Sequence, residues 1–264
     1  MLIIAERINA TRKRVAEAFA SRDAAFIQEE ARRQADAGAD CLDVNAALDP
    51  RQEPGLMAWA VETVRQATDV PLAVDTANPD AARAGLEHLP KGSAFLNSIT
   101  AERDRLAAML PLAAEFQTRL VALAMDDSGL PASCEARWKA LDAIFAATDD
   151  AGIPRERIYV DPLVRPVSTD PEQAGQCLRM IREIGERGGG ARTVIGLSNI
   201  SYGLPQRRHL NRTFLALAAG AGLSAAIIDP LEPDLMATLL AAACLTGQDE
   251  FCMNYIAAQR AGRL

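Results

Sequence analysis

The sequence predicts a single (β/α)8 barrel, a TIM barrel, formed by residues 1–264. Short apolar runs of strand length alternate with longer segments of helical periodicity along the chain, and there are eight such pairs. A barrel of this kind takes about 250 residues. No low-complexity linker or shift in composition divides the chain. The alternative, a doubly wound open sheet, is disfavoured because the first strand-to-helix turn has no glycine-rich loop.

The eight predicted strands are short runs rich in Val, Ile, Leu and Ala. In chain order they are residues 2–4, 41–44, 72–74, 94–96, 120–124, 158–160, 193–197 and 225–228. Eight strands spaced along the whole chain are typical of the closed barrel.

The predicted helices have apolar residues at three- and four-residue spacing and recognisable start signals. They are residues 24–38, 54–68, 79–89, 101–116, 133–151, 171–187, 211–221 and 233–246. Asp23 precedes the first of these, and proline opens the second and third, as is common in the first turn of a helix. Gly38, Gly152 and Gly222 stand where a left-handed residue would end a helix.

Charge and cysteine content exclude several classes of protein. With 28 Lys and Arg against 35 Asp and Glu, the net charge is −7, so a nucleic-acid groove is not expected. The five cysteines form no C-x-x-C pair, and the first residues, MLIIAERIN, do not resemble a secretory signal. We therefore expect a reduced, cytoplasmic protein with no membrane span.

A ring of polar side chains follows the predicted strands. Active sites of such barrels lie at the carboxyl ends of the strands, so these residues should gather at one mouth. The ring comprises Glu6, Asn9, Asp43, Asn45, Asp75, Asn78, Asn97, Ser98, Met125, Asp126, Asp161, Ser198, Asn199 and Asp229.

The ring is built from amides and carboxylates. The only two histidines, His88 and His209, lie away from the strand ends, which argues against a zinc or di-metal site. No lysine follows a strand and there is no G-x-S-x-G motif, so Schiff-base and serine-nucleophile chemistry are not expected.

Amides and carboxylates can hold a flat heterocycle such as a 2-amino-4-oxopyrimidine, because a carboxylate accepts two N–H bonds from a guanidine-like edge. Two other interpretations stay open. Many of these side chains, Asn78 and Asp126 above all, could form helix caps or turns. Alternatively, Asp43, Asp75, Asp161 and Asp229 could hold magnesium.

Seven segments together resemble one known family. They are LIIAERIN at residues 2–9, CLDVN at 41–45, VDTAN at 74–78, LNS at 96–98, YVDPL at 159–163, VIGLSNIS at 194–201 and NRTFL at 211–215. In this order they resemble the methyltetrahydrofolate:corrinoid protein methyltransferases of the pterin-binding barrel superfamily. The resemblance extends from Leu2 to about Asp229.

The resemblance implies roles for particular residues. Asp75, Asn97 and Asp161 would bind the pterin ring, and Asn199 would lie against N5, the nitrogen that carries the methyl group. Ser198 would bind as part of the same turn. Asn199, Asp161 and Asp75 would be the catalytic residues, with Asn199 stabilising N5 as it gains a proton.

Arg207 would contact the folate, although it could equally be a solvated loop arginine beside Arg208. The chain departs from the family pattern at a few positions. These are Ala5, Thr100, Asp126, Asp127 and Tyr202. The departures concern the folate tail and the partner surface more than the pterin pocket.

The implied substrates are tetrahydrofolate or 5-methyltetrahydrofolate and a corrinoid, cobalamin, carried by a separate protein. Mobile loops around Asp126 and residues 202–209 would admit this partner. A homodimer is also expected, and residues 213–221 and 236–243 could face the barrel or a second subunit. Dihydropteroate synthase is disfavoured because its lysine near the seventh strand and its terminal S-x-R pattern are missing. A folate-binding subunit without turnover stays a non-enzymatic alternative.

Overall fold

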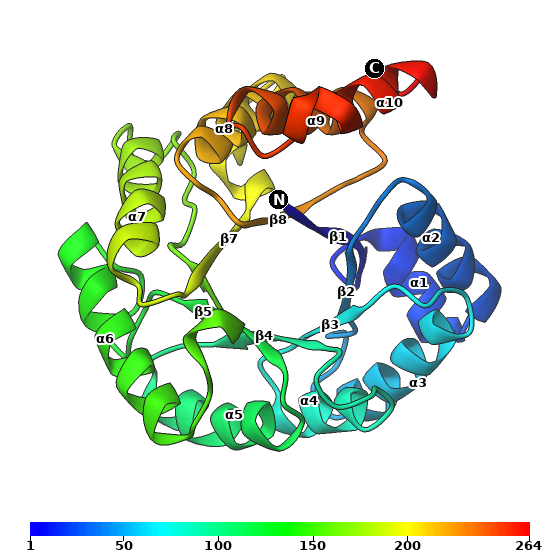
Figure 1. Cartoon of the computed structure of the whole chain (residues 1–264). Coiled ribbons are helices and arrows are strands. Elements are labelled where there is room, and N and C mark those ends of the chain that lie inside the picture. The colour runs from blue at the N-terminus through cyan, green and yellow to red at the C-terminus, as the bar shows by residue number, and fades with distance from the viewer.

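The computed structural model describes residues 1–264 and consists of eight parallel strands closed into a barrel in the order β1-β2-β3-β4-β5-β6-β7-β8 (Figure 1). The strands are β1 (Leu2–Asn9), β2 (Cys41–Asn45), β3 (Leu72–Asp75), β4 (Phe95–Ile99), β5 (Arg119–Leu123), β6 (Ile158–Asp161), β7 (Arg192–Gly196) and β8 (Ala225–Ile228). Parallel pairing of β1 with β8 completes the closure. The predicted (β/α)8 fold is confirmed.

Helices connect consecutive strands and surround the barrel (Figure 1). They are α1 (Lys13–Ser21), α2 (Ala24–Asp36), α3 (Glu53–Arg65), α4 (Pro79–Leu86), α5 (Arg103–Glu115), α6 (Cys134–Asp150), α7 (Gln173–Arg187), α8 (Arg207–Gly220), α9 (Pro233–Leu245) and α10 (Met253–Arg260). Short 3-10 turns occur at η1 (Arg155–Arg157), η2 (Leu197–Ser201) and η3 (Glu250–Cys252). The chain therefore ends in α10, which lies against α9 (Figure 1).

Capping contacts confirm the predicted starts of α2 and α6. The Asp23 side chain accepts the Phe26 N–H at the start of α2, and Ser133 does the same for Ala136 at the start of α6. Gly38, with φ of 95°, has the left-handed conformation expected of a helix stop. Gly152 and Gly222 also have positive φ.

Two boundary predictions were wrong at the mouth of the barrel. β1 does not end at Ile4 but continues to Asn9, so Glu6 and Asn9 lie within the strand. α8 begins at Arg207 instead of residue 211, so the last part of the expected loop 202–209 is helical. α1 and α10 were not predicted from the sequence.

The barrel interior is closed by one layer of eight buried side chains, one from each strand. The layer consists of Ile4, Cys41, Ala73, Phe95, Val121, Tyr159, Val194 and Ala225. Phe95 and Tyr159 meet edge to face with ring centroids 5.0 Å apart. Because this layer is apolar and packed, it forms a floor beneath whatever binds at the mouth.

The larger apolar clusters lie between the strands and the surrounding helices. None of the helices combines the length and the apolar character that crossing a membrane requires.

Candidate active site

The polar site is the next inward layer above the apolar floor. Alternate residues of a strand point to the same side, so the inward residues of this layer stand two positions after those of the floor. They are Glu6, Asp43, Asp75, Asn97, Leu123, Asp161, Gly196 and Ile227. Five of these eight residues have polar side chains. They lie within the strands, whereas the sequence predicted a polar ring that follows the strands.

Asp75, Asn97, Asp43 and Asn45 form one connected network. Asp75 and Asn97 are paired positions of the β3–β4 ladder. The Asn97 Nδ2 donates to Asp43 Oδ1 at 3.1 Å, and the Asn45 Nδ2 donates to Asp75 Oδ2 at 3.0 Å. The two carboxyl groups lie near enough for each to affect the pKa of the other. The structure therefore brings together two of the predicted pterin-binding residues, Asp75 and Asn97.

Burial governs the acidity of this network. Desolvation raises the pKa of Asp43 well above its ordinary value, and the nearby Asp75 raises it further. Desolvation also raises the pKa of Asp75, against the lowering effect of its hydrogen bond from Asn45. The positive charge of Arg105 also lowers the pKa of Asp75.

Asp161 lies at the end of β6 and is 8% exposed. Its Oδ1 accepts the Leu163 N–H at 2.8 Å, and it also accepts the backbone N–H of Gly196. Desolvation raises its pKa to about 6, although these two backbone hydrogen bonds act in the opposite direction. The buried Arg137 fixes the loop after β6 by donating to the Pro162 carbonyl at 2.7 Å.

Ser198 and Asn199 lie in the η2 turn directly after β7. The Ser198 Oγ donates to Glu6 Oε1 at 3.1 Å, which joins this turn to β1. Asn199 is exposed at the mouth, and a side chain at Gly196 would place its Cβ 3.1 Å from the Asn199 Nδ2. Because Gly196 has no side chain, the Asn199 amide can lie close to the end of β7.

Arg207 supports the same turn from the start of α8. Its Nε donates to Ser201 Oγ at 3.0 Å, and its Nη2 donates to the Ser198 carbonyl. Its guanidinium also lies 5.9 Å from the centre of the Tyr202 ring. Arg207 is thus bound to the turn that carries Asn199 and is not a free loop arginine.

Several ring residues have local structural roles. The Asn78 side chain caps α4 by accepting from Asp80 and Ala81, and the Asp126 Oδ1 accepts the Ser128 N–H in a turn. The Asn9 Oδ1 accepts the Thr11 N–H at 3.0 Å. The interpretation of Asn78 and Asp126 as a cap and a turn former is confirmed.

The magnesium interpretation does not fit the geometry. Arg7 binds Asp229 with an Nη1 to Oδ2 distance of 2.8 Å, and Arg12 approaches the same oxygen at 3.4 Å. The Asp229 carboxylate is therefore already paired with two arginines, where β1 and β8 meet. No group of three or more His, Cys, Asp or Glu side chains is arranged to hold a metal ion.

Two residues that contribute to the site were missed by the sequence analysis. Arg105 of α5 reaches back to the Ser98 carbonyl with its Nε and Nη2, both at 3.2 Å. Glu53 of α3 is buried and accepts hydrogen bonds from Thr76 and Asn78. Neither stands at a strand end, so only the packing of the helices onto the barrel reveals them.

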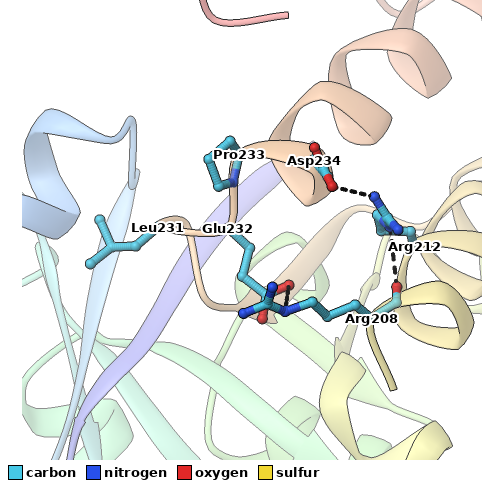
Figure 2. A pocket seen from close by; sticks show the side chains of 6 residues that line it. All are labelled: Arg208, Arg212, Leu231, Glu232, Pro233 and Asp234. Atoms are coloured by element: carbon cyan, nitrogen blue, oxygen red, sulfur yellow. Dashed lines mark hydrogen bonds and ion pairs between the residues drawn. The ribbon is translucent and has the colours of Figure 1, made fainter. Parts of the chain in front are cut away.

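A small cavity lies beside the mouth between the start of α8 and the loop after β8 (Figure 2). Its volume is about 80 Å³, and its charged side chains are paired with each other, Arg212 with Asp234 at 2.6 Å and Arg208 with Glu232 at 4.0 Å. Sites for small molecules usually measure about 300 to 1,000 Å³. This cavity is too small to be the main site.

Comparison with known proteins gives a consistent set of similarities. The family model described as pterin binding enzyme matches residues 5–229. The methylcorrinoid:tetrahydrofolate methyltransferase of Eubacterium limosum is 32% identical over 266 residues, which cover 100% of this chain and 98% of that protein. Methionine synthase of Mycobacterium tuberculosis is 29% identical over 241 residues, covering 86% of this chain but 20% of that protein.

The similar solved structures include dihydropteroate synthases. The enzyme from Coxiella burnetii in complex with pteroic acid has a TM-score of 0.72 at 16% identity, with 94% of both chains covered. The enzyme from Xanthomonas albilineans in complex with 7,8-dihydropteroate has a TM-score of 0.68 at 23% identity, covering 94% of this chain and 93% of that one. At these identities the similarity establishes the fold alone.

Proposed function

The chain belongs to the pterin-binding enzyme family, and on that premise we propose that it moves a methyl group between N5 of tetrahydrofolate and the cobalt of a corrinoid on a separate protein. The observation that carries this proposal is the match to the Eubacterium limosum methylcorrinoid:tetrahydrofolate methyltransferase across the full length of both chains. The polar layer at the barrel mouth supports it, because the chemistry of that layer suits a pterin.

Asp75, Asn97 and Asp161 would hold the pterin ring. They come from three strands, β3, β4 and β6, and stand in one layer above the apolar floor. The carboxylates of Asp75 and Asp161 are hydrogen-bond acceptors, which suits the N–H groups along the edge of a 2-amino-4-oxopteridine. The rigid strands would fix the ring so that N5 always points to the same part of the mouth.

Asn199 would act at N5. An amide can donate a hydrogen bond to this nitrogen or accept one from it, so it can stabilise N5 both before and after protonation. When folate is the methyl donor, N5 is the leaving group and must gain a proton. When folate is the acceptor, the N5 lone pair attacks the methyl group and N5 then loses a proton. Ser198 and Arg207 would keep the turn that carries Asn199 in place.

The corrinoid would enter as a substrate bound to its own protein. Its cobalt supplies the nucleophile or the leaving group for the methyl group. This chain would bind the folate and orient it at the barrel mouth. The mouth is exposed, and Asn199 is accessible there. The alternative function, dihydropteroate synthase, is not supported. The lysine expected of that enzyme near the seventh strand is missing from the segment Gly196 to Ser201.

The outer face of α8 and α9 would form the homodimer contact. Leu217 on α8 is 52% exposed, and in α9 only Leu235, Leu239 and Ala242 are buried although nearly the whole helix is apolar. α8 and α9 pack side by side at the outside of the barrel (Figure 1). A surface helix that is apolar on all sides is typical of a contact with another protein.

The function is tested by following the corrinoid spectrum when the chain is mixed with 5-methyltetrahydrofolate and cobalt(I) corrinoid proteins. We expect methyl transfer that depends on the chain. Asn199→Ala should lower the transfer rate about 10²- to 10³-fold while changing folate affinity little, because its interaction with N5 strengthens in the transition state. An unchanged rate combined with lost affinity would contradict this role for Asn199. Folate binding without transfer to any corrinoid protein would favour a binding subunit without turnover.

A further inference from the structure

Arg137 is a fully buried cation whose hydrogen-bond acceptors are all neutral. It lies near the start of α6 and is 0% exposed. Its Nε donates to the Pro162 carbonyl at 2.7 Å, its Nη1 to Gln176 Oε1 at 3.0 Å and its Nη2 to Gln173 Oε1 at 3.4 Å. A buried charge is costly unless hydrogen bonds replace its hydration, and the partial positive charge at the start of a helix adds to this cost. The three acceptors therefore hold the guanidinium in one place.

The guanidinium is oriented from the neighbouring helix α7 (Figure 1). The Gln173 Nε2 donates to Asp170 Oδ2 at 2.6 Å, so the Gln173 Oε1 is left to accept from Arg137. Gln176 lies about one turn further along α7. Because two nitrogens of the planar guanidinium are bound to α7, its Nε can point in only one direction, at the loop after β6.

The Pro162 carbonyl belongs to the same peptide group as the Leu163 N–H. Arg137 binds the oxygen of this group at 2.7 Å, and the Asp161 Oδ1 accepts its N–H at 2.8 Å. A peptide group is planar, so the direction of its C=O bond fixes the direction of its N–H bond. Arg137 therefore points the Leu163 N–H at the Asp161 carboxylate.

The backbone at this point needs such support. Leu163 has a left-handed conformation with φ of 63°, which residues other than glycine rarely adopt. The hydrogen bonds at both ends of the preceding peptide group hold it there. Hydrogen bonds that share one peptide group also polarise each other, so a cation on the C=O makes the N–H a stronger donor. The charge of Arg137 thus acts on Asp161 through a single peptide group.

We propose that Arg137 is a positioning residue for Asp161, which acts through the peptide group between Pro162 and Leu163. It fixes and polarises this group, and the group in turn holds the Asp161 carboxylate in the orientation that accepts from the pterin. Arg137 is itself buried and does not touch a ligand at the mouth. What the inference says of the pterin rests on the proposed function, whereas the contacts concern the folded chain alone.

Amide hydrogen exchange at Leu163, measured by NMR without folate, tests the contacts. Arg137→Met removes all three donors and should speed exchange of the Leu163 N–H at least about tenfold, whereas the N–H groups of β6 should keep their wild-type rates. Asp161→Ala removes the acceptor and should have the same effect. Unchanged exchange at Leu163 in Arg137→Met, or a rise shared equally by β6, would overturn the proposal whether or not the chain binds folate.

The role in binding is tested by a double-mutant cycle with 5-methyltetrahydrofolate. Arg137→Met should weaken binding at least about tenfold in the wild-type background and less than about threefold in Asp161→Ala, where the residue through which it acts is missing. Equal losses in the two backgrounds would contradict the proposal, since Arg137 would then support the fold without acting through Asp161.

Thr148→Val is the matched control. Thr148 is also 0% exposed in α6, its hydroxyl donates to the Phe145 carbonyl, and it lies about three turns beyond Arg137. This variant should change neither Leu163 exchange nor folate affinity by more than about twofold. Effects as large as those of Arg137→Met would mean that any buried change in α6 disturbs the site, against the proposal.

Arg137→Lys keeps the charge but not the planar fork of donors, so it should lie between the wild type and Arg137→Met in both measurements. It takes the place of Arg137→Met in the cycle if that variant does not fold. If the wild-type chain bound no folate at all, the proposed function would fail, while Leu163 exchange would still decide whether Arg137 positions Asp161.

Discussion

Asp161 connects the ionisation of a single residue to the chemistry of the site. Its carboxyl group is almost fully buried and accepts two backbone N–H groups, which hold it in place for a ligand. Burial nevertheless raises its pKa to about 6, mainly through desolvation, so its charge is lost under mildly acidic conditions. Both ligand binding and stability should therefore depend on pH near this value.

Folate affinity should fall as the pH decreases through about 6, because protonated Asp161 accepts fewer hydrogen bonds from the pterin edge. Equilibrium titrations with 5-methyltetrahydrofolate between about pH 5 and about pH 8 would measure this fall. Affinity that stays constant or rises toward acidic pH would contradict the role assigned to the Asp161 anion.

The same residue should reduce stability at neutral pH. Between its ordinary pKa of 3.8 and the folded-state pKa of about 6, the folded chain binds more protons than the unfolded chain. The free energy of unfolding therefore falls as the pH rises through this window. Asp161→Asn should be more stable than the wild type at about pH 8, by about 1 to 3 kcal/mol, although it should bind folate more weakly.

Urea unfolding at about pH 4 and about pH 8 would measure this difference, which should shrink at the acidic pH where Asp161 is protonated. Asp142→Asn, which removes an exposed carboxylate of α6, is the control and should change the free energy of unfolding by less than about 0.5 kcal/mol. Equal effects of the two substitutions would argue against the raised pKa.

At the residue scale, the sequence predicted the members of the site better than their contacts. Asp75, Asn97 and Asp161 could be selected because each lies at or near a strand end, where a parallel barrel builds its site. The hydrogen bonds of Asn97 with Asp43 and of Arg105 with Ser98 depend on which side chains face each other across strands and helices. Spacing along one chain does not contain that information.

At the scale of elements, α4 lies very close to the barrel. A Cβ atom at Gly85 would meet Met57 Cγ of α3 at 2.9 Å and Val74 Cγ1 of β3 at 3.1 Å. β3 ends at Asp75, so the close packing of α4 helps to define where a site residue stands. A glycine is required here by space and not by backbone conformation.

Gly85→Ala should therefore reduce the free energy of unfolding by about 1 to 2 kcal/mol, because overpacking outweighs the better helix propensity of alanine. The matched control is Gly55→Ala in α3, where a Cβ would meet nothing within 4 Å. That substitution should be neutral or stabilise the chain by up to about 1 kcal/mol. Denaturant unfolding of both variants would measure the difference, and equal changes would disprove the packing argument.

The elements that the sequence analysis missed or misplaced lack the usual start signals. α1 follows Arg12 and α8 follows Gln206, and neither residue makes a side-chain cap. Gln206 even has a left-handed conformation, with φ of 52°. By contrast, helices with Asp23, Asn78 or Ser133 before them were predicted correctly, since these side chains accept the first free N–H groups.

At the scale of the whole molecule, closure of the barrel brings the first and last strands together. Arg7 of β1 binds Glu30 of α2 and Asp229 after β8, both at 2.8 Å, so it ties the first and last strands to each other. This closure places the Ser198 turn beside Glu6. The alternation of strands and helices predicted the barrel, but only the closed structure shows which residues from its two ends meet.

The outer face of α8 and α9 gives a prediction about assembly. Leu217→Glu should convert a dimer into monomers in light scattering coupled to size-exclusion chromatography, because it places a charge in an apolar contact. Leu48→Glu is the control, since Leu48 is 39% exposed on the loop after β2 and lies outside this face. A wild-type chain that is monomeric at all concentrations would contradict the proposed contact.

The central claim is that the barrel mouth binds a reduced folate through an acceptor wall made by Asp75, Asn97 and Asp161. Isothermal titration calorimetry of the folded chain with 5-methyltetrahydrofolate, without added metal, tests it most directly. We predict saturable binding at one site per chain that Asp161→Ala weakens at least about tenfold, because buried donors of the pterin would lose their acceptor. No heat of binding from the folded wild-type chain with any reduced pteridine would contradict the account.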